Sequence, residues 1–148
     1  MSLPLPIDRL LQIYENTEAI AVVGASADPL KQANRVPRYL QTEGFRVIPV
    51  NPRGGVILGL PAVPSLLEVG RPVDVVQVFR PADEAPGIAR DAVAAGAGVL
   101  WLQLGIVSAE AQRIAQAGGL TVVMDVCMGA THKLLRRRHG LAARVPEE

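Results

Sequence analysis

The sequence has few of the features that mark a secreted or membrane protein. It contains one cysteine, Cys127, in 148 residues, so it cannot form an internal disulfide, and nothing indicates an oxidising compartment. Residues 1–8 have no basic segment followed by a long apolar core, so they do not resemble a signal peptide. No apolar run approaches the roughly twenty residues that a membrane-spanning helix needs. These absences predict a cytoplasmic protein that has no membrane partner.

Aromatic residues and net charge are also scarce. Phe, Tyr and Trp make up 3% of the residues, whereas apolar residues make up 49%. The core must therefore consist mainly of Val, Leu, Ile and Ala, which suits helices layered on a sheet. The formal net charge of +1 gives no general attraction to nucleic acid, and the basic run at residues 136–139 is interpreted as a solvated helix end. We expect no nucleic-acid partner.

Five short apolar segments alternate with helical patterns along the chain. Because each pair of parallel strands needs a right-handed crossover, this alternation predicts an α/β fold. The expected fold is a Rossmann-like, doubly wound parallel sheet of five strands with helices on both faces. The expected strands are residues 19–24, 45–50, 73–79, 99–105 and 120–126.

The strand order expected for this sheet is 3-2-1-4-5, which places the switch point between strands one and four. Asp83 and Ser108 are expected to cap the helices that follow strands three and four, and a last helix is expected to begin near Ala130. No change in composition divides the chain. We therefore expect one domain over residues 1–148, with an N-terminal helix at 1–16 and a C-terminal tail at 137–148.

The loop after the first strand predicts a phosphate site. The apolar run stops at Gly24 and is followed by small residues, which leave backbone N–H groups uncovered near the start of a helix. The loop departs from the dinucleotide fingerprint G-x-G-x-x-G, because Ser26 and Pro29 replace the second and third glycines. Asn51 stands where an NAD-binding protein has an acidic residue after the second strand. These departures argue against NAD and leave an NADP-linked oxidoreductase as an alternative, with Arg53 on the 2′-phosphate.

Cationic residues gather near the expected ends of the strands and near the first loop. Each of them, taken singly, is typical of a solvated surface residue. Together they favour an anionic ligand with several phosphates, because Arg and Lys are the residues that bind phosphate groups. The five residues are Lys31, Arg35, Arg38, Arg53 and Arg80.

A serine hydrolase is a second alternative. Residues 24–28 resemble the nucleophile elbow G-x-S-x-G, and the chain order allows a triad of Ser26, Asp125 and His132. Against this interpretation, Asp28 replaces the last glycine, and the elbow follows the first strand instead of a later one. A metal site is not expected, because Cys127 and His132 have too few ligands near them in the sequence.

Segments from every expected strand resemble a known family, the small stand-alone CoA-binding proteins. These proteins are similar to the N-terminal CoA-binding domain of the succinyl-CoA synthetase α-subunit. The resemblance runs from about Thr17 to Leu135 with all segments in order. Its segments are IAVVGAS (20–26), RVIPVNP (46–52), VDVVQVFR (73–80), LWLQLG (100–105) and VMDVC (123–127).

The resemblance implies that coenzyme A lies across the carboxyl ends of the strands. The synthetase's phosphorylated histidine belongs to a second domain with no counterpart here, so the resemblance implies ligand binding without catalysis of the chain's own. The apolar N-terminal helix is compatible with a homodimer. The implied contacts are Gly24, Ala25 and Ser26 at the pyrophosphate; Asn51, Pro52 and Arg53 at the 3′-phosphate and ribose; Val78, Phe79 and Arg80 at the adenine; Leu102 and Gln103 at the pantetheine arm; and Lys31 and Arg35 as added charge at the phosphates.

Overall fold

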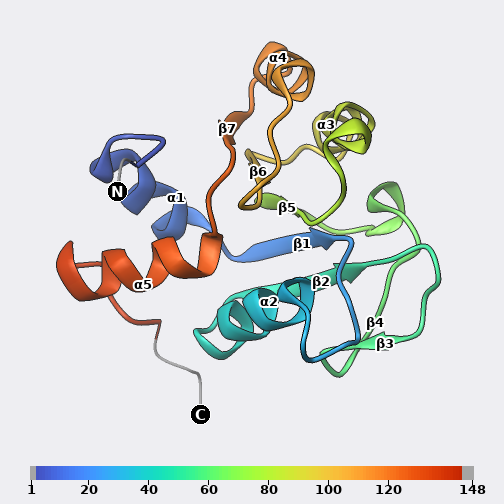
Figure 1. The fold of residues 1–148 in the computed structure, drawn as a ribbon, viewed down its shortest axis with the longest axis horizontal. Helices are drawn as coiled ribbons and strands as arrows, with labels where there is room; N and C mark the ends of the chain where they lie inside the picture. The colour runs from blue at the N-terminus through green and yellow to red at the C-terminus, as the bar shows by residue number, and fades with distance from the viewer. Residues whose placement is uncertain (1–2, 145–148) are drawn as a thin grey trace.

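A five-stranded parallel sheet forms the centre of the computed structural model, which describes residues 3–144 (Figure 1). The apolar, β-branched segments form its strands, and all four neighbouring pairs are parallel. The predicted α/β, Rossmann-like class is therefore confirmed. The strands are β1 (Ala19–Val23), β2 (Arg46–Val50), β5 (Val75–Val78), β6 (Val99–Leu102) and β7 (Thr121–Val123).

The predicted strand order is wrong. The order is β2-β1-β5-β6-β7, so the third long strand lies beside the first and not outside the second. The outer edge of β2 is already occupied, because Val63 N donates to Pro49 O at 2.9 Å and Asn51 N donates to Val63 O at 2.9 Å. The strand order therefore reverses between β1 and β5, and the crevice at their carboxyl ends is where such sheets bind ligands.

The segment that occupies this edge was not expected to contain strands. It begins with a hairpin of β3 (Val56–Ile57) and β4 (Leu60–Pro61), and it continues through the 3₁₀ turn η1 (Leu66–Glu68). Leu66 packs in the core on the face that also carries Ala21 and Val76. The chain thus returns across β1 on that face and enters β5.

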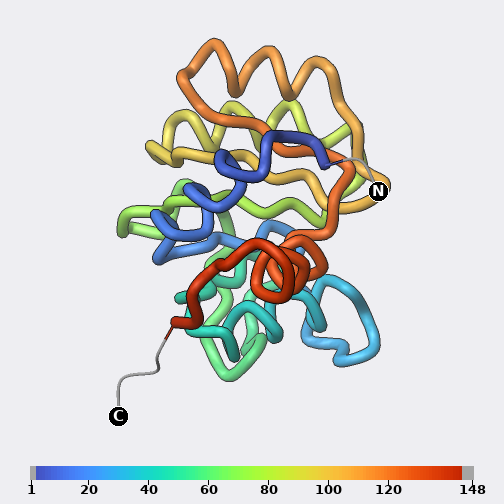
Figure 2. The backbone as a smooth tube through the Cα atoms, turned by 90° about the vertical axis from the view of Figure 1, so that its left-hand side faces the viewer, coloured from blue at the N-terminus to red at the C-terminus, as the bar shows by residue number. Residues whose placement is uncertain are grey.

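Helices cover both faces of the sheet, as predicted. In Figures 1 and 2, α3 and α4 lie together on one side, and α2 and α5 lie together on the other. Because side chains alternate along a strand, Ile20 and Val22 pack toward one group of helices and Ala19 and Ala21 toward the other. The first core contains α1 (Ile7–Asn16), α2 (Gln32–Thr42) and α5 (Met128–Arg138); the second contains α3 (Ala85–Ala94) and α4 (Ala109–Ala117).

Local signals at the helix starts were correct for Ser108, wrong for Asp83 and within two residues for the last helix. Ser108 caps α4 as predicted, since its Oγ accepts from Ala111 N at 3.1 Å. Asp83 is not a cap, because it lies inside the 3₁₀ turn η2 (Ala82–Glu84) and Glu84 precedes α3. The last helix begins at Met128, because Cys127 caps it by accepting from Ala130 N at 3.5 Å.

The predicted C-terminal tail is partly helical. Helix α5 extends through Arg138, and residues 145–148 lie outside the described residues. Arg144 donates to the carbonyls of Tyr14 and Thr17 and lies 4.1 Å from the centre of the Phe45 ring. Within residues 3–144, no helix is long and apolar enough to cross a bilayer.

Candidate functional site

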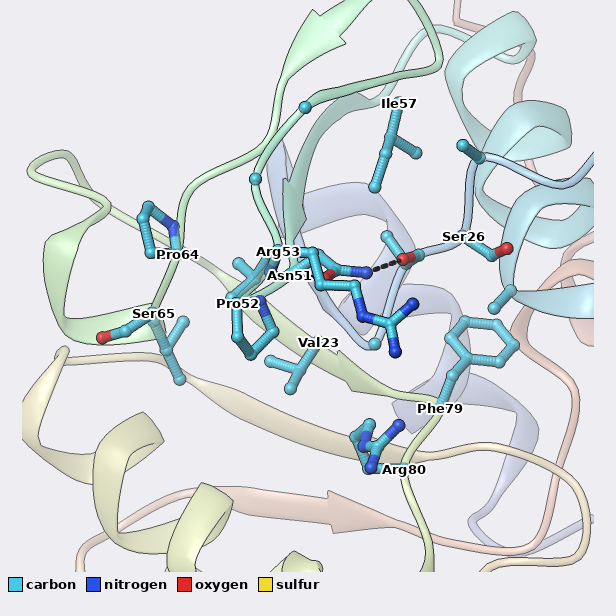
Figure 3. A pocket seen from close by; sticks show the side chains of 18 of the residues that line it. Val23, Ser26, Asn51, Pro52, Arg53, Ile57, Pro64, Ser65, Phe79 and Arg80 are labelled. Atoms are coloured by element: carbon cyan, nitrogen blue, oxygen red, sulfur yellow. Dashed lines mark hydrogen bonds between the residues drawn. The ribbon is translucent and has the colours of Figure 1, made fainter.

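A cleft of about 860 Å³ opens at the carboxyl ends of β1, β2 and β5, beside the switch point (Figure 3). This volume lies in the range of small-molecule and cofactor sites. Three loops that are distant in the sequence form its walls. They bring together nine of the thirteen predicted site residues, namely Gly24, Ala25, Ser26, Lys31, Asn51, Pro52, Arg53, Phe79 and Arg80.

Gly24 allows the end of β5 to approach the end of β1. Its φ of +87° lies in the left-handed region that side chains rarely adopt. A Cβ at this position would lie 2.8 Å from Arg80 Cδ and 3.0 Å from the carbonyl oxygen of Phe79. The absence of a side chain at Gly24 therefore sets the position of Arg80 in the cleft.

The backbone N–H groups of the β1–α2 loop are only partly available. Gly24 N donates to Val50 O at 3.0 Å, and Ser26 N donates to Ala33 O at 3.2 Å. Within residues 3–144, Ala25 N and Ala27 N have no acceptor. Of the three residues predicted at the pyrophosphate, Gly24 and Ser26 thus use their N–H groups within the fold, and Ala25 keeps its N–H available.

Local hydrogen bonds fix the shape of this loop. Ser26 Oγ accepts from Asp28 N at 3.1 Å, and Asp28 Oδ1 accepts from Leu30 N at 2.9 Å. Asn34 Nδ2, from the first turn of α2, donates to Ser26 O at 2.8 Å. Side-chain turns of this kind hold a backbone without a ligand, so the loop is preorganised.

Asn51 joins the loops after β1 and β2. Its Nδ2 donates to Ala25 O at 2.9 Å (dashed in Figure 3), and its Oδ1 accepts from Arg53 N at 2.9 Å. An aspartate here would direct an oxygen at the Ala25 carbonyl instead of a donor. The side chain that replaces the acidic residue of NAD-binding proteins is therefore required by the cleft's own structure.

Three of the five cationic residues reach the cleft. Lys31, Arg53 and Arg80 line it, and Figure 3 shows Arg53 extending from the loop after β2 toward Phe79 and Arg80. Arg35 and Arg38 are exposed on α2 and do not line the cleft. Of Lys31 and Arg35, which were predicted together as added charge at the phosphates, only Lys31 lines the cleft.

Arg80 is paired with a carboxylate that also lines the cleft. Its Nε donates to Glu84 Oε1 at 3.2 Å and a terminal nitrogen donates to Glu84 Oε2 at 2.6 Å. This hydrogen bonding raises the pKa of Arg80 and lowers the pKa of Glu84. Glu84 was missed by the sequence analysis, although opposite charges four residues apart are a recognisable signal.

The other predicted site residues lie outside the cleft. The side chains of Val78 and Leu102 are fully buried in the core that contains α3 and α4. Gln103 is also buried, and its Oε1 accepts from Gln77 Nε2 at 3.1 Å and Met128 N at 2.9 Å. Gln103 therefore holds the start of α5 against the sheet, and these three side chains do not line the cleft.

The predicted hydrolase triad does not form. Asp125 Oδ1 accepts from Gly105 N at 2.7 Å, and His132 Nδ1 lies 2.7 Å from Tyr39 OH. His132 is 3% exposed, whereas Ser26 lines the cleft. Within residues 3–144, no hydrogen bond joins Ser26 to Asp125 or His132. The interpretation of Ser26 as an activated nucleophile is therefore wrong.

The buried polar groups around His132 are structural. Burial lowers the pKa of His132, and burial raises the pKa of Tyr39 to about 12. Both side chains are thus neutral near pH 7, and their hydrogen bond ties α2 to α5. The described part of the chain has no group of three His, Cys, Asp or Glu side chains placed to hold a metal ion.

The sequence analysis also missed the part of the cleft formed after β2. The hairpin and the turn that follows it contribute Ile57, Pro64, Ser65 and Leu66 to the lining. Two-residue strands have no hydrophobic periodicity to detect. The signals that were present are the paired Gly54 and Gly55 and the turn glycine Gly59, all at positive φ.

Known proteins resemble this chain over most of its length. Residues 18–133 match the family model described as a CoA binding domain. The uncharacterized protein YneT of Bacillus subtilis is 38% identical over 125 residues, which cover 84% of this chain and 93% of YneT. The structure of "cell-free ID.343" from Thermus thermophilus has a TM-score of 0.85 and 39% identity, and covers 88% of this chain and 99% of its own. The ADP-forming acetate–CoA ligase I of Archaeoglobus fulgidus is 30% identical over 124 residues, which are 76% of this chain and 18% of the ligase.

Proposed function

This chain belongs to the CoA-binding domain family, and from that membership we propose that it binds coenzyme A, or an acyl-CoA, in the cleft at the carboxyl ends of β1, β2 and β5. The observation that carries the proposal is the convergence of Lys31, Arg53 and Arg80 on one cleft. Coenzyme A carries a pyrophosphate and a 3′-phosphate, so it requires several cationic partners within a short distance. Within residues 3–144, Lys31 and Arg53 have no carboxylate partner, and a neutral metabolite would leave both without one.

The geometry supports a division of the cleft between the parts of the ligand. The unpaired N–H groups of Ala25 and Ala27, beside Lys31, suit the pyrophosphate. Arg53, held by its backbone bond to Asn51, suits the 3′-phosphate. Phe79 also lines the cleft, and its aromatic ring suits the adenine.

We assign no catalytic step to the chain. This chain matches 18% of the acetate–CoA ligase, and the activity in the ligase's name is that of the whole ligase. The residues that lined up as a hydrolase triad are engaged elsewhere. The proposed role is therefore that of a cytoplasmic CoA-binding module, for which any chemistry is supplied by another protein.

Isothermal titration calorimetry with CoA tests the proposal. We expect micromolar or tighter binding, and Arg53→Ala should weaken it at least about tenfold, because a charge-assisted contact to phosphate is lost. Arg38→Ala is the matched control, since it removes the same charge from an exposed site on α2 outside the cleft. It should leave the affinity within about twofold.

The same titration separates CoA from NADP, which remains the alternative ligand because Arg53 lines the cleft. Binding of NADPH, with no heat from CoA or acetyl-CoA at high protein concentration, would contradict the proposal. Equal losses in Arg53→Ala and Arg38→Ala would contradict the placement of the ligand in this cleft.

A further inference from the structure

The ion pair between Arg80 and Glu84 lies in the wall of the cleft. The carboxylate takes two donors of the guanidinium, at 2.6 and 3.2 Å, and both side chains are about half exposed, at 47% and 45%. Within residues 3–144, neither Lys31 nor Arg53 has a carboxylate partner. Arg80 is thus the one cleft cation whose charge is already matched in the described part of the chain.

The charges that line the cleft cancel in number. Its cations are Lys31, Arg53 and Arg80, and its carboxylates are Asp28, Glu84 and Asp91. Asp28 has a separate structural use, because it accepts the N–H of Leu30 in the loop. The Glu84 carboxylate makes no capping bond at α3, and within residues 3–144 its hydrogen-bond partners are Arg80 Nε and a terminal nitrogen of Arg80.

We propose that Glu84 is an internal counterion that competes with the ligand for Arg80, an inference that rests on the proposed function. A phosphate that takes the guanidinium edge used by Glu84 must displace the carboxylate. A phosphate that takes the other edge must lie close to the negative charge of Glu84. In both arrangements Glu84 opposes binding, and Arg80 contributes less to affinity than an unpaired arginine would.

The contacts around Arg80 allow such an exchange. The backbone of Gly24 lies close to Cγ and Cδ of Arg80, so the stem of the side chain is held against the end of β1. The Arg80 side chain as a whole is about half exposed, and its guanidinium is held by Glu84. A ligand phosphate therefore exchanges one partner of a positioned guanidinium for another, without movement of the sheet.

Calorimetric titration of CoA into a set of variants tests this inference. Glu84→Gln keeps the size of the side chain and removes its charge, and we expect it to bind CoA about fivefold more tightly than the unaltered chain. Asp91→Asn is the matched control, because it removes the same charge from the same cleft without breaking an arginine pair. It should change the affinity by less than about twofold.

A double variant tests whether the effect passes through Arg80. In an Arg80→Ala background, Glu84→Gln should tighten binding by less than about twofold, since no guanidinium remains to be released. Thermal melts of each variant verify the fold, which we expect to be intact because Glu84 is an exposed side chain without a capping bond.

The outcomes distinguish this inference from the proposed function. Unchanged or weaker binding by Glu84→Gln overturns the inference, as does an equal gain in Asp91→Asn or a full gain in the Arg80→Ala background. If the unaltered chain binds CoA and Arg53→Ala weakens it, the proposed function stands regardless of these results. If no variant binds CoA, both are overturned.

Discussion

Gly24→Ala provides the most direct test of how the cleft is built. The residue has φ of +87°, and an added Cβ would approach Arg80 Cδ to 2.8 Å and the carbonyl oxygen of Phe79 to 3.0 Å. The substitution therefore combines two separate penalties. One is the left-handed backbone, and the other is a close contact at the junction of β1 and β5.

The two penalties can be given approximate sizes. A left-handed conformation costs a residue with a Cβ about 1–2 kcal/mol. Extra volume in a packed site typically costs a further 1–3 kcal/mol, and the Phe79 oxygen belongs to the backbone and cannot rotate away. We expect Gly24→Ala to lower the free energy of unfolding by about 3 kcal/mol. For a chain of this size, that corresponds to a fall in Tm of about 10 °C.

Gly96→Ala separates the two contributions. Gly96 has φ of +75°, but an added Cβ would have no heavy atom within 4 Å. It should therefore show the backbone penalty alone, about 1–2 kcal/mol. Urea denaturation of the two variants, with m-values unchanged, gives the difference. If Gly24→Ala is no less stable than Gly96→Ala, the close approach of β5 to β1 does not require a glycine, and the reasoning is refuted.

Two further predictions concern polar contacts outside the ion pair. Asn51→Asp should lower the free energy of unfolding by about 1–3 kcal/mol at pH 7, because a carboxylate replaces the donor to Ala25 O. Urea denaturation measures the change, and unchanged stability would show that this bond does not hold the two loops together. Burial lowers the pKa of His132 in the folded chain. Below the ordinary histidine pKa of about 6.5, the unfolded chain therefore binds more protons than the folded chain, and the free energy of unfolding should fall as the pH drops below that value. His132→Gln should reduce the slope of stability against pH between about 6.5 and 5; an equal slope in both proteins would show that His132 is not the responsible group.

Much of the architecture follows from short-range patterns in the chain. The apolar runs that stop at Gly24, Asn51 and Arg80 identify strands whose carboxyl ends share one edge of a parallel sheet. Residues after these strands therefore had to lie close together, whichever order the strands took. This is why Asn51, Arg53 and Arg80 were predicted in the cleft and are found there.

Where the structure places residues elsewhere than predicted, contacts between distant residues are the reason. Val78, Leu102 and Gln103 belong to strand ends, as predicted, but whether a side chain faces the core or the cleft depends on register and on the helix above it. The hydrolase interpretation failed for a similar reason, because Tyr39 takes the ring nitrogen that a triad would use.

The sequence by itself determined the class of the fold and the positions of the strands, because hydrophobic periodicity and turn residues are local properties. It also placed cationic residues after the strands that end at the cleft. Only the tertiary structure decided the strand order. Val63 pairs with the outer edge of β2, so β5 pairs with β1 on its other side. The tertiary structure also decided which cations are unmatched. The four-residue spacing of Arg80 and Glu84 is a local signal in the sequence, but only the fold brings that pair into the cleft and leaves Arg53 without a carboxylate partner among the described residues.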